Sequence, residues 1–351
     1  MKKIAYLTGT RADFGLMKRI LKGIGVDKKL ELQLLATGIH LMDEFGYTIT
    51  GVEKEFKVNQ VIEEVFEKDN KESMARFVGK CTIGVVGALI KLNPDMVIIL
   101  GDRGEQLAMT TAAAYLNIPI IHLHGGEETT TIDDKVRNAI SQLSDWHLPA
   151  TKKARKKLIK MGADKKKVKV VGAPGLDEIK EIKPADKKDL IVVLQHPDGN
   201  ESNAEKQIKN TLEAVIKFKL GIKIIYPNAD AGGRKIIKII EQYAGKYPQL
   251  IEAFKHIKRE KFLKLLTQTR VLVGNSSAGL IESPSLGLAV VNVGSRQKNR
   301  EKAKNVIDVG YKTKAIEKAI RKALGMKIDK IKNPYGDGRT SERVIKFLKR
   351  L

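Results

Sequence analysis

Short runs of consecutive apolar residues recur along the chain, and amphipathic stretches of helical period separate most of them. A continuous apolar run, rather than an alternating one, indicates a strand that is buried on both faces, as in a parallel sheet. Parallel strands are joined by crossovers that are usually helices, so this alternation predicts an α/β fold. In the first half of the chain the runs are residues 3–8 (KIAYLT), 32–36 (LQLLA), 96–100 (MVIIL) and 120–123 (IIHL).

The same alternation returns in the second half, after a segment rich in glycine, proline and charge. Such a composition is typical of a domain boundary, and we place the linker at 173–188. We therefore predict two Rossmann-like domains, 1–172 and 189–351, that face a central cleft. The final helix, 341–351, is free to pack back on the first domain. The runs of the second half are 190–195, 222–226, 271–273 and 289–293.

The composition narrows the classes of function. The chain has 351 residues, with a single cysteine (Cys81) and 5% aromatic residues. One cysteine excludes a disulfide framework, and so few aromatic residues argue against a stacking surface for single-stranded nucleic acid. We find no run of about 18 apolar residues suited to crossing a membrane. The start, MKKIAYLTGT, resembles a strand rather than a signal peptide. We expect a cytoplasmic protein with no membrane partner.

The charge is strongly positive, with 65 Lys+Arg against 41 Asp+Glu and a formal net charge of +24. The lysines are spread through almost every predicted helix, and no nucleic-acid signature is present. We favour a lysine-rich solvated surface. Attraction of an anionic small substrate and binding of nucleic acid are the alternatives, and we predict no nucleic-acid partner.

Candidate functional residues lie where the apolar runs end, at the edge of the sheet where α/β proteins bind ligands. Arg11 follows the run 3–8, and Asp102 and Arg103 follow the run 96–100. An acid next to a guanidinium group is either a structural ion pair or part of a site. Arg11 in this position is suited to binding a phosphate, and an exposed loop arginine is the alternative.

The densest group of ionisable residues is the segment HLHGGEETTTIDDKVRNAIS at 122–141. It contains His124, Glu127 and Asp133, and such a mixture of histidine and carboxylates is typical of proton transfer. The spacing H-x-H without a third soft ligand makes a metal site the weaker alternative, and we predict no metal. Asp133 could instead complement the dipole of the helix that begins there.

In the second half, VLVGNSSAGLIESPSL at 271–286 predicts a strand, a turn and a helix over about 278–286. Ser276 and Ser277 are placed at the N-cap of this helix, where a hydroxyl satisfies a backbone N–H group. Free N–H donors and the helix dipole attract anions to the same place. A plain helix cap is the alternative.

Four other residues in the second half are candidates. Glu282 lies on the predicted helix, where it could contact a ribose or be a solvated side chain. His196 follows the run 190–195, Asn228 lies in the loop PNADAGG, and Arg296 follows the run 289–293. Neither a G-x-G-x-x-G nor a P-loop motif is present, so we predict no dinucleotide cofactor and no cofactor of another kind.

Nine short motifs are spread over nearly the whole chain. They are TRADFG (10–15), GDRGE (101–105), HLHGGE (122–127), TIDDKVRNAIS (131–141), LQHP (194–197), PNADAG (227–232), GNSSAG (274–279), NVGSRQKNR (292–300) and YGDG (335–338). In this order they resemble the hydrolysing UDP-N-acetylglucosamine 2-epimerases, which have the two-domain GT-B fold. The resemblance implies that UDP-GlcNAc, or a 2,4-diacetamido UDP-sugar, reacts with water to give UDP and the free 2-epimer. We also expect a homo-oligomer, either a dimer or a tetramer.

The resemblance implies a role for most of the candidate residues. Asp102 and Asp133 match catalytic carboxylates, His196 would contact the phosphates or the leaving oxygen, and His124 and Glu127 would take part in proton transfer. In the family reaction, departure of UDP acidifies carbon 2 of the sugar, and a base then removes its proton to give a glycal, which water hydrates. The implied substrate-binding residues are Arg11, Arg103, Asn228, Ser276, Ser277, Glu282 and Arg296.

One position departs from the family pattern. Many members have Glu where this chain has His124, so either His124 transfers the proton, Glu127 or Glu128 takes over, or the sugar differs. The non-hydrolysing epimerases usually have H-x-E-A-G-x-R and G-D-T, whereas GGE and GDR here favour the hydrolysing type, which supplies sialic-acid-like sugars. A non-hydrolysing epimerase, a GT-B glycosyltransferase and a nucleic-acid-binding protein are the alternatives.

Overall fold

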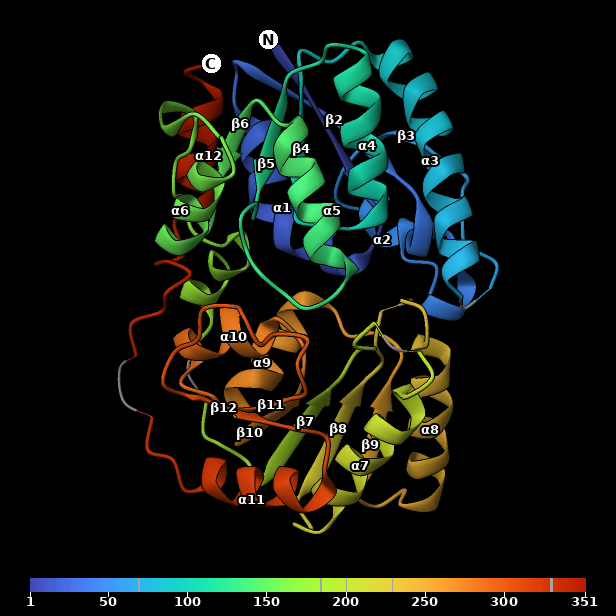
Figure 1. Cartoon of the computed structure of the whole chain (residues 1–351), viewed down its shortest axis with the longest axis vertical. Coiled ribbons are helices and arrows are strands. Elements are labelled where there is room, and N and C mark those ends of the chain that lie inside the picture. The colour runs from blue at the N-terminus through green and yellow to red at the C-terminus, as the bar shows by residue number, and fades with distance from the viewer. Residues whose placement is uncertain (69, 184, 200, 229, 329–330) are drawn as a thin grey trace. The chain divides into compact units, whose positions relative to one another are not determined.

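The computed structural model describes residues 1–351 except 69, 184, 200, 229 and 329–330. The chain forms two compact units, and each contains one parallel six-stranded sheet (Figure 1). Unit 1 consists of Met1–Glu127, Ile132–Glu178 and Tyr335–Leu351, and unit 2 of Glu128–Thr131 and Ile179–Pro334. The predicted α/β fold with two parallel sheets is confirmed.

The sheet of unit 1 has the strand order β3-β2-β1-β4-β5-β6, which is the order 3-2-1-4-5-6 of a Rossmann fold. All neighbouring strands are parallel. Because the chain moves outward from β1 in one direction and from β4 in the other, β1 and β4 flank the switch point of the sheet. The strands are β1 (Lys2–Thr8), β2 (Leu30–Ala36), β3 (Val58–Val61), β4 (Met96–Leu100), β5 (Ile120–Leu123) and β6 (Trp146–Leu148).

Helices cover both faces of this sheet. One face packs against α1 and α12 through a core that includes Tyr6, Met17 and Phe347. On the other side, α3 packs along α4, and α4 contacts β1 and β4. The helices are α1 (Arg11–Val26), α2 (Ile49–Glu53), α3 (Lys71–Leu92), α4 (Gly104–Tyr115), α5 (Ile132–Leu143), α6 (Lys152–Lys160) and α12 (Thr340–Leu348).

The last helix, α12, belongs to unit 1 although unit 2 precedes it in the chain. The Phe347 ring meets the Trp146 ring edge to face, with the centroids 5.4 Å apart. Lys349 pairs with Asp27 at the end of α1 at 2.7 Å. The sequence analysis had counted residues 335–351 with the second domain while allowing the helix to pack on the first.

The sheet of unit 2 has the order β12-β11-β10-β7-β8-β9. Counted from β7, this is again 3-2-1-4-5-6, so the two units share one topology without a visible sequence repeat. The strands are β7 (Leu190–Leu194), β8 (Gly221–Ile225), β9 (Ile251–Phe254), β10 (Val271–Gly274), β11 (Ala289–Val293) and β12 (Val306–Val309).

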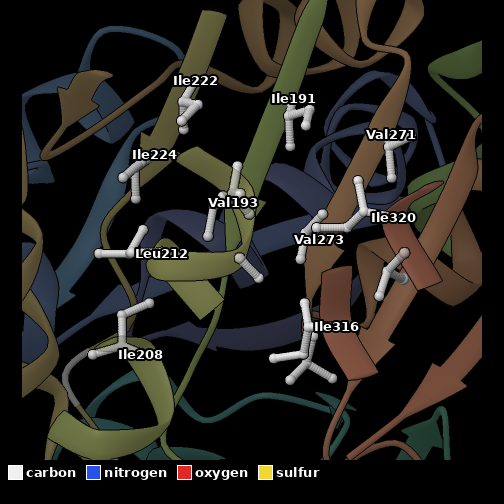
Figure 2. Close-up of a cluster of buried hydrophobic side chains, with 14 of the residues drawn as sticks. Ile191, Val193, Ile208, Leu212, Ile222, Ile224, Val271, Val273, Ile316 and Ile320 are labelled. Carbon is white, nitrogen blue, oxygen red and sulfur yellow. The ribbon is translucent and has the colours of Figure 1, made fainter. Parts of the chain in front are cut away.

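The core of unit 2 lies mainly between the sheet and helices α7, α8 and α11. Figure 2 shows Ile and Val side chains of β7, β8 and β10 facing Ile208 and Leu212 of α7 and Ile316 and Ile320 of α11. A smaller cluster with α9 covers the other face. The helices are α7 (Ala204–Ile216), α8 (Gly233–Lys246), α9 (Arg259–Gln268), α10 (Ala278–Ile281) and α11 (Thr313–Leu324).

Short 3₁₀ helices complete the described structure. They are η1 (Gly38–Leu41), η2 (Asp43–Phe45), η3 (Lys165–Lys167), η4 (Pro174–Leu176), η5 (Ile179–Glu181) and η6 (Ser283–Leu286). The sequence analysis did not find strands β3 and β12. Both are edge strands with partly exposed residues, and the polar side chains in VNQV and VIDV interrupt the apolar run by which the central strands were found.

Helix α3 is long and apolar enough to cross a membrane by length and composition, with a mean hydropathy of 1.4 over its best window. The sequence analysis looked for an unbroken apolar run, and α3 has none, because Arg76, Lys80, Thr82 and three glycines interrupt it. In unit 1, α3 packs along α4 and buries Phe77, Cys81, Val85 and Leu89. Part of its apolar surface therefore belongs to the interior of the unit.

Two buried histidines lie near the carboxyl edge of the unit 1 sheet. The His40 ring bonds to the hydroxyls of Thr8 (2.9 Å) and Thr48 (2.8 Å). Burial lowers the pKa of His40 to about 4 and the pKa of His122 to about 3. Both rings are therefore neutral in the folded protein at neutral pH.

We expect unit 1 to lose stability as the pH falls from 6.5 toward 4. In that window the unfolded chain binds a proton at each histidine and the folded unit does not, so their stabilising effect is complete above pH 6.5 and is lost on acidification. The slope should approach about 1.4 kcal/mol per pH unit for each histidine. Urea unfolding followed by the fluorescence of Trp146 measures it, and His40→Asn should reduce the slope. An unchanged slope would show that His40 is not buried in its neutral form.

Candidate active site

The carboxyl ends of β1, β4 and β5 lie at one edge of the unit 1 sheet. Arg11 follows β1, Asp102 and Arg103 follow β4, and His124 follows β5. Open α/β sheets bind ligands at this edge, next to the switch point. The strand order therefore brings these four predicted residues of unit 1 to the edge where a ligand is expected.

The turn from β1 into α1 is fixed by a buried carboxylate. Thr10 caps α1 and forms a capping box with Asp13. Asp13 accepts hydrogen bonds from the Thr8 hydroxyl (2.9 Å) and from the backbone N–H groups of Gly9 (3.1 Å) and Phe14 (2.7 Å). These bonds favour the charged form, but burial dominates and raises the pKa of Asp13. The turn that presents Arg11 is thus held by side-chain and backbone bonds together.

Arg11 is the first residue of α1 and is half-buried. Its Nη1 is buried and has no hydrogen-bond partner among the described residues. Burial lowers the pKa of Arg11 to about 10, so the side chain still carries its charge at neutral pH. A buried, charged and unsatisfied donor is costly unless an acceptor arrives, which favours the predicted binding of an anionic group by Arg11.

Asp102 and Arg103 are neighbours in sequence but do not pair with each other. Arg103 Nε donates to Glu105 Oε1 at 2.7 Å, and the buried Glu105 side chain packs over Gly9. Asp102 forms its ion pair with Arg137 of α5 instead. The alternative of an ion pair between Asp102 and Arg103 is therefore wrong, since each pairs with a different residue of unit 1. A role of either residue in a site stays a prediction.

Arg137 is the largest fully buried side chain of the described structure, with 1% of its surface exposed. Its guanidinium group contacts Asp102 and donates to Asp134 Oδ1 at 2.8 Å. It also donates to the carbonyl of Glu127 at 3.0 Å. Asp134 is thus a partner of Arg137, and Asp133 lies half-buried in the same first turn of α5. The catalytic role of Asp133 stays a prediction.

His122 faces the interior of unit 1. Its Nε2 lies 2.8 Å from the Gly101 carbonyl, which can only accept, so Nε2 carries the proton. Nδ1 then accepts from the Ser141 hydroxyl at 3.0 Å. The neutral ring thereby fixes the Gly101 turn, where φ is +74°, directly before Asp102.

His124 and Glu127 form a close pair in the same motif. Nδ1 of His124 lies 2.6 Å from Glu127 Oε1, and the two side chains are 12% and 4% exposed. His124 has a φ of +62°, which is uncommon for a residue with a side chain. The turn thus directs His124 and Glu127 toward each other within unit 1.

In unit 2 the corresponding edge is held by Asn275, which directly follows β10. Its side chain accepts from the His196 N–H at 2.7 Å and donates to the His196 carbonyl at 2.9 Å. Gly274 has a φ of +137°, and a Cβ there would lie 2.1 Å from the Leu194 carbonyl oxygen. Glycine at 274 therefore lets β10 approach β7 closely enough for Asn275 to form both hydrogen bonds with the backbone of His196.

The loops after β7, β8 and β11 meet around the same asparagine. The backbone N–H of Asn228 donates to Nδ1 of His196 at 3.2 Å, which places the ring proton of neutral His196 on Nε2. The carbonyl of Asn275 accepts from Arg296 Nη1 at 3.3 Å and from Gln297 Nε2 at 3.0 Å. The predicted residues His196, Asn228 and Arg296 are therefore brought together in unit 2.

The predicted helix over 278–286 is wrong beyond residue 281. The α-helix is a single turn, α10, and a 3₁₀ turn follows it, because Pro284 has no N–H group with which to continue the α-helix. Ser277 occupies the N-cap but makes no capping bond, and Ser276 Oγ only approaches the N–H of Ala278 at 3.4 Å. A dipole from so short a helix is weak, and phosphate binding by Ser276 and Ser277 stays a prediction.

Glu282 is 3% exposed, so the solvated alternative for this residue is wrong. Its carboxylate pairs with Arg259 Nη1 of α9 at 2.8 Å. A buried charge is tolerated because this partner is present. A ribose contact by Glu282 stays a prediction, and the ion pair with Arg259 would hold the carboxylate in place for it.

Sequence reasoning assigned no role to Arg137, Asn275, Arg259 or Tyr311. Tyr311 donates to Asp198 at 2.9 Å, burial raises its pKa, and its ring packs over Gly294. Arg137 lies in the motif TIDDKVRNAIS and Asn275 in the motif GNSSAG, so their places in these motifs could have indicated a role. Arg259 lies outside the motifs and offered none.

No group of three or more His, Cys, Asp or Glu side chains that could hold a metal ion occurs among the described residues. In unit 1 the candidate residues are acid–base groups together with the cationic Arg11. In unit 2 they are neutral polar groups together with the cationic Arg296.

Comparison with known proteins places the chain in a family. The model of the family described as UDP-N-acetylglucosamine 2-epimerase matches residues 22–349. The chain belongs to this epimerase family. The resemblance inferred from the nine motifs is confirmed.

Relatives within the epimerase family are similar over nearly the full chain. A Legionella pneumophila protein named UDP-N,N'-diacetylbacillosamine 2-epimerase (hydrolyzing) is 39% identical over 99% of this chain and 96% of its own length. A Campylobacter jejuni protein named GDP/UDP-N,N'-diacetylbacillosamine 2-epimerase (hydrolyzing) is 34% identical over 88% of this chain and 84% of its own. Among solved structures, an S. aureus MnaA–UDP co-structure has a TM-score of 0.84 at 20% identity, and covers 100% of this chain and 96% of that one. This likeness supports the GT-B type of fold.

We expect the pair between Arg259 and Glu282 to stabilise unit 2 whatever its role in ligand binding. Arg259→Met leaves the Glu282 carboxylate buried and uncompensated, which should cost about 3–5 kcal/mol of unfolding free energy. Chemical unfolding followed by circular dichroism measures the loss. The matched double variant, Arg259→Met with Glu282→Met, should recover most of it. A double variant as unstable as Arg259→Met would contradict the ion-pair explanation.

Proposed function

We propose that the protein is a hydrolysing 2-epimerase that converts a UDP-linked 2-acetamido sugar and water into UDP and the free 2-epimer. Membership of the epimerase family and the two relatives named as hydrolysing enzymes support this function. The motifs GDR and GGE, which differ from the non-hydrolysing pattern, support the same choice. The proposal includes a cytoplasmic location, a homo-oligomer, and no membrane or nucleic-acid partner.

The observation that carries the proposal is the ion cluster around Arg137. The buried guanidinium group holds Asp102 by its carboxylate and Glu127 by its carbonyl, and Glu127 holds His124. Acid–base groups from the ends of β4 and β5 are thus fixed at one edge of unit 1. A reaction that moves protons to and from carbon needs such fixed groups, which typically contribute about 10²–10⁴-fold each.

The proposed reaction needs two kinds of residue, cationic groups that bind the diphosphate and acid–base groups that move the proton on carbon 2. The proton on carbon 2 becomes acidic only as the C1–O bond to UDP breaks and positive charge develops on the sugar. Cationic side chains such as Arg11 and Arg296 stabilise the departing diphosphate. A base takes the proton of carbon 2 to give a glycal, water adds at carbon 1, and a proton returns to carbon 2 on the opposite face. We assign the proton transfers to Asp102, His124 and Asp133, and the diphosphate contacts also to His196, Ser276 and Ser277.

For the sugar, we propose a UDP-2,4-diacetamido sugar of the N,N'-diacetylbacillosamine type rather than UDP-GlcNAc. Support comes from the names of the two relatives and from their similarity to this chain over most of its length. The replacement of the usual Glu by His124 fits a change at the sugar.

Incubation with each UDP-sugar in deuterated water tests the function. We expect UDP and a free sugar with deuterium at carbon 2, formed faster from the diacetamido substrate, because the proton that returns comes from solvent-exchanged groups. Product analysis by proton NMR distinguishes the outcomes. A UDP-linked 2-epimer as the only product would indicate the non-hydrolysing reaction, and no release of UDP from either sugar would contradict the proposal.

Asp102→Asn should lower kcat by about 10²–10⁴-fold while UDP still binds, because it removes the ionisable group but keeps the shape of the side chain. Turnover and UDP titration measure the two effects. Asp134→Asn is the matched control, since Asp134 also pairs with Arg137. An equal loss in both variants would mean that Asp102 acts only by holding Arg137.

A further inference from the structure

The pair formed by His124 and Glu127 is held by its surroundings independently of any ligand. The Glu127 carbonyl accepts from Arg137 at 3.0 Å and from Lys157 of α6 at 3.4 Å. Gly126, with a φ of +79°, packs so closely that a Cβ there would lie 2.4 Å from the Ala154 carbonyl oxygen. The backbone of the turn is thus anchored on α5 and α6, and the position of the Glu127 carboxylate is set.

This position determines which nitrogen of His124 carries the proton. An ionised carboxylate can only accept hydrogen bonds, and Glu127 Oε1 lies 2.6 Å from Nδ1 of His124. Nδ1 of the neutral ring is therefore the donor, and Nε2 is left with its lone pair. His122, two residues earlier, has the opposite tautomer because its Nε2 donates to Gly101.

Nε2 of His124 is suited to accepting a proton. It has no hydrogen-bond partner among the described residues, and 12% of the side chain is exposed at the carboxyl edge of the sheet. A proton accepted at Nε2 makes an imidazolium ion, and the Glu127 carboxylate at Nδ1 stabilises its charge. The arrangement of carboxylate, imidazole and substrate proton is the one by which enzymes orient a histidine base.

We propose, on the basis of the proposed function, that Nε2 of His124 exchanges the proton on carbon 2 of the sugar and that Glu127 is a positioning residue that acts through His124. The C2–H electron pair becomes the C1=C2 bond as the C1–O bond to UDP breaks, and the proton goes to Nε2. The protonated carboxyl group of Asp102 or Asp133 then gives its proton to carbon 2 on the opposite face as water adds at carbon 1. The surplus proton of that water returns to the same carboxylate, and Nε2 releases its proton to solvent with the departure of UDP. Glu127 itself does not touch the sugar.

The tautomer can be measured without any turnover. Two-bond proton–nitrogen NMR correlations on histidine-labelled protein distinguish the two neutral forms, and His124→Gln assigns the signal among the six histidines. We expect the Nδ1–H form for His124 and the Nε2–H form for His122. A His124 ring with its proton on Nε2 would overturn the proposal.

A double-mutant cycle separates a positioning role from a general structural one. Glu127→Gln should lower kcat by about 10–10³-fold with little change in KM, and His124→Gln by at least as much. In the His124→Gln background, Glu127→Gln should then cost almost nothing, because it has no imidazole left to orient. An equal cost in both backgrounds would assign Glu127 to the structure of the turn and overturn the proposal.

The NMR measurement and the double-mutant cycle distinguish a failure of this inference from a failure of the proposed function. A wild-type protein that turns over neither UDP-sugar contradicts the proposed function, and the NMR signal of His124 still reports whether the pair exists. Full turnover together with an additive cycle contradicts the inference and leaves the proposed function intact.

Discussion

The site of unit 1 depends on a single buried guanidinium group. Removing a charged group from water is costly, and Arg137 is tolerated only because two carboxylates and a carbonyl surround it. These partners come from the end of β4, the first turn of α5 and the turn after β5. Arg137 therefore ties three segments into one arrangement, and the positions of Asp102 and of the pair between His124 and Glu127 follow from it.

The loops at the carboxyl edge of the sheet are held together by different groups in the two units. Each presents loops at the carboxyl edge of a sheet with one strand order. In unit 2 the joining residue is a neutral amide, Asn275, which holds both backbone groups of His196 and accepts from Arg296 and Gln297. Arg296 and Gln297 donate to the backbone carbonyl of Asn275, so the groups that join the loops of unit 2 through Asn275 carry no negative charge. In unit 1 the charged groups are balanced against one another, which suits proton transfer.

The sequence predicted the fold and the strand ends well because parallel central strands are apolar throughout and their carboxyl ends share an edge. It did not predict β3 or β12, since edge strands need no continuous apolar run. It also considered a pair between Asp102 and Arg103, whereas Asp102 pairs with Arg137 of α5 and Arg103 with Glu105, two residues further along the chain. Pairings such as Arg259 with Glu282 depend on distances that only the folded chain defines. Pro284 does indicate the end of an α-helix, but the prediction of a helix over 278–286 followed the apolar pattern around it instead.

Unit 1 is discontinuous, and this has a consequence for how the protein is made. Helix α12 supplies Val344, Phe347 and Leu348 to the core of unit 1, yet it is synthesised only after nearly all of unit 2. Until then the apolar surface of α1 and Trp146 lacks its cover. Unit 1 is thus completed only after unit 2 has been synthesised, and the apolar surface left uncovered until then favours aggregation of the nascent chain.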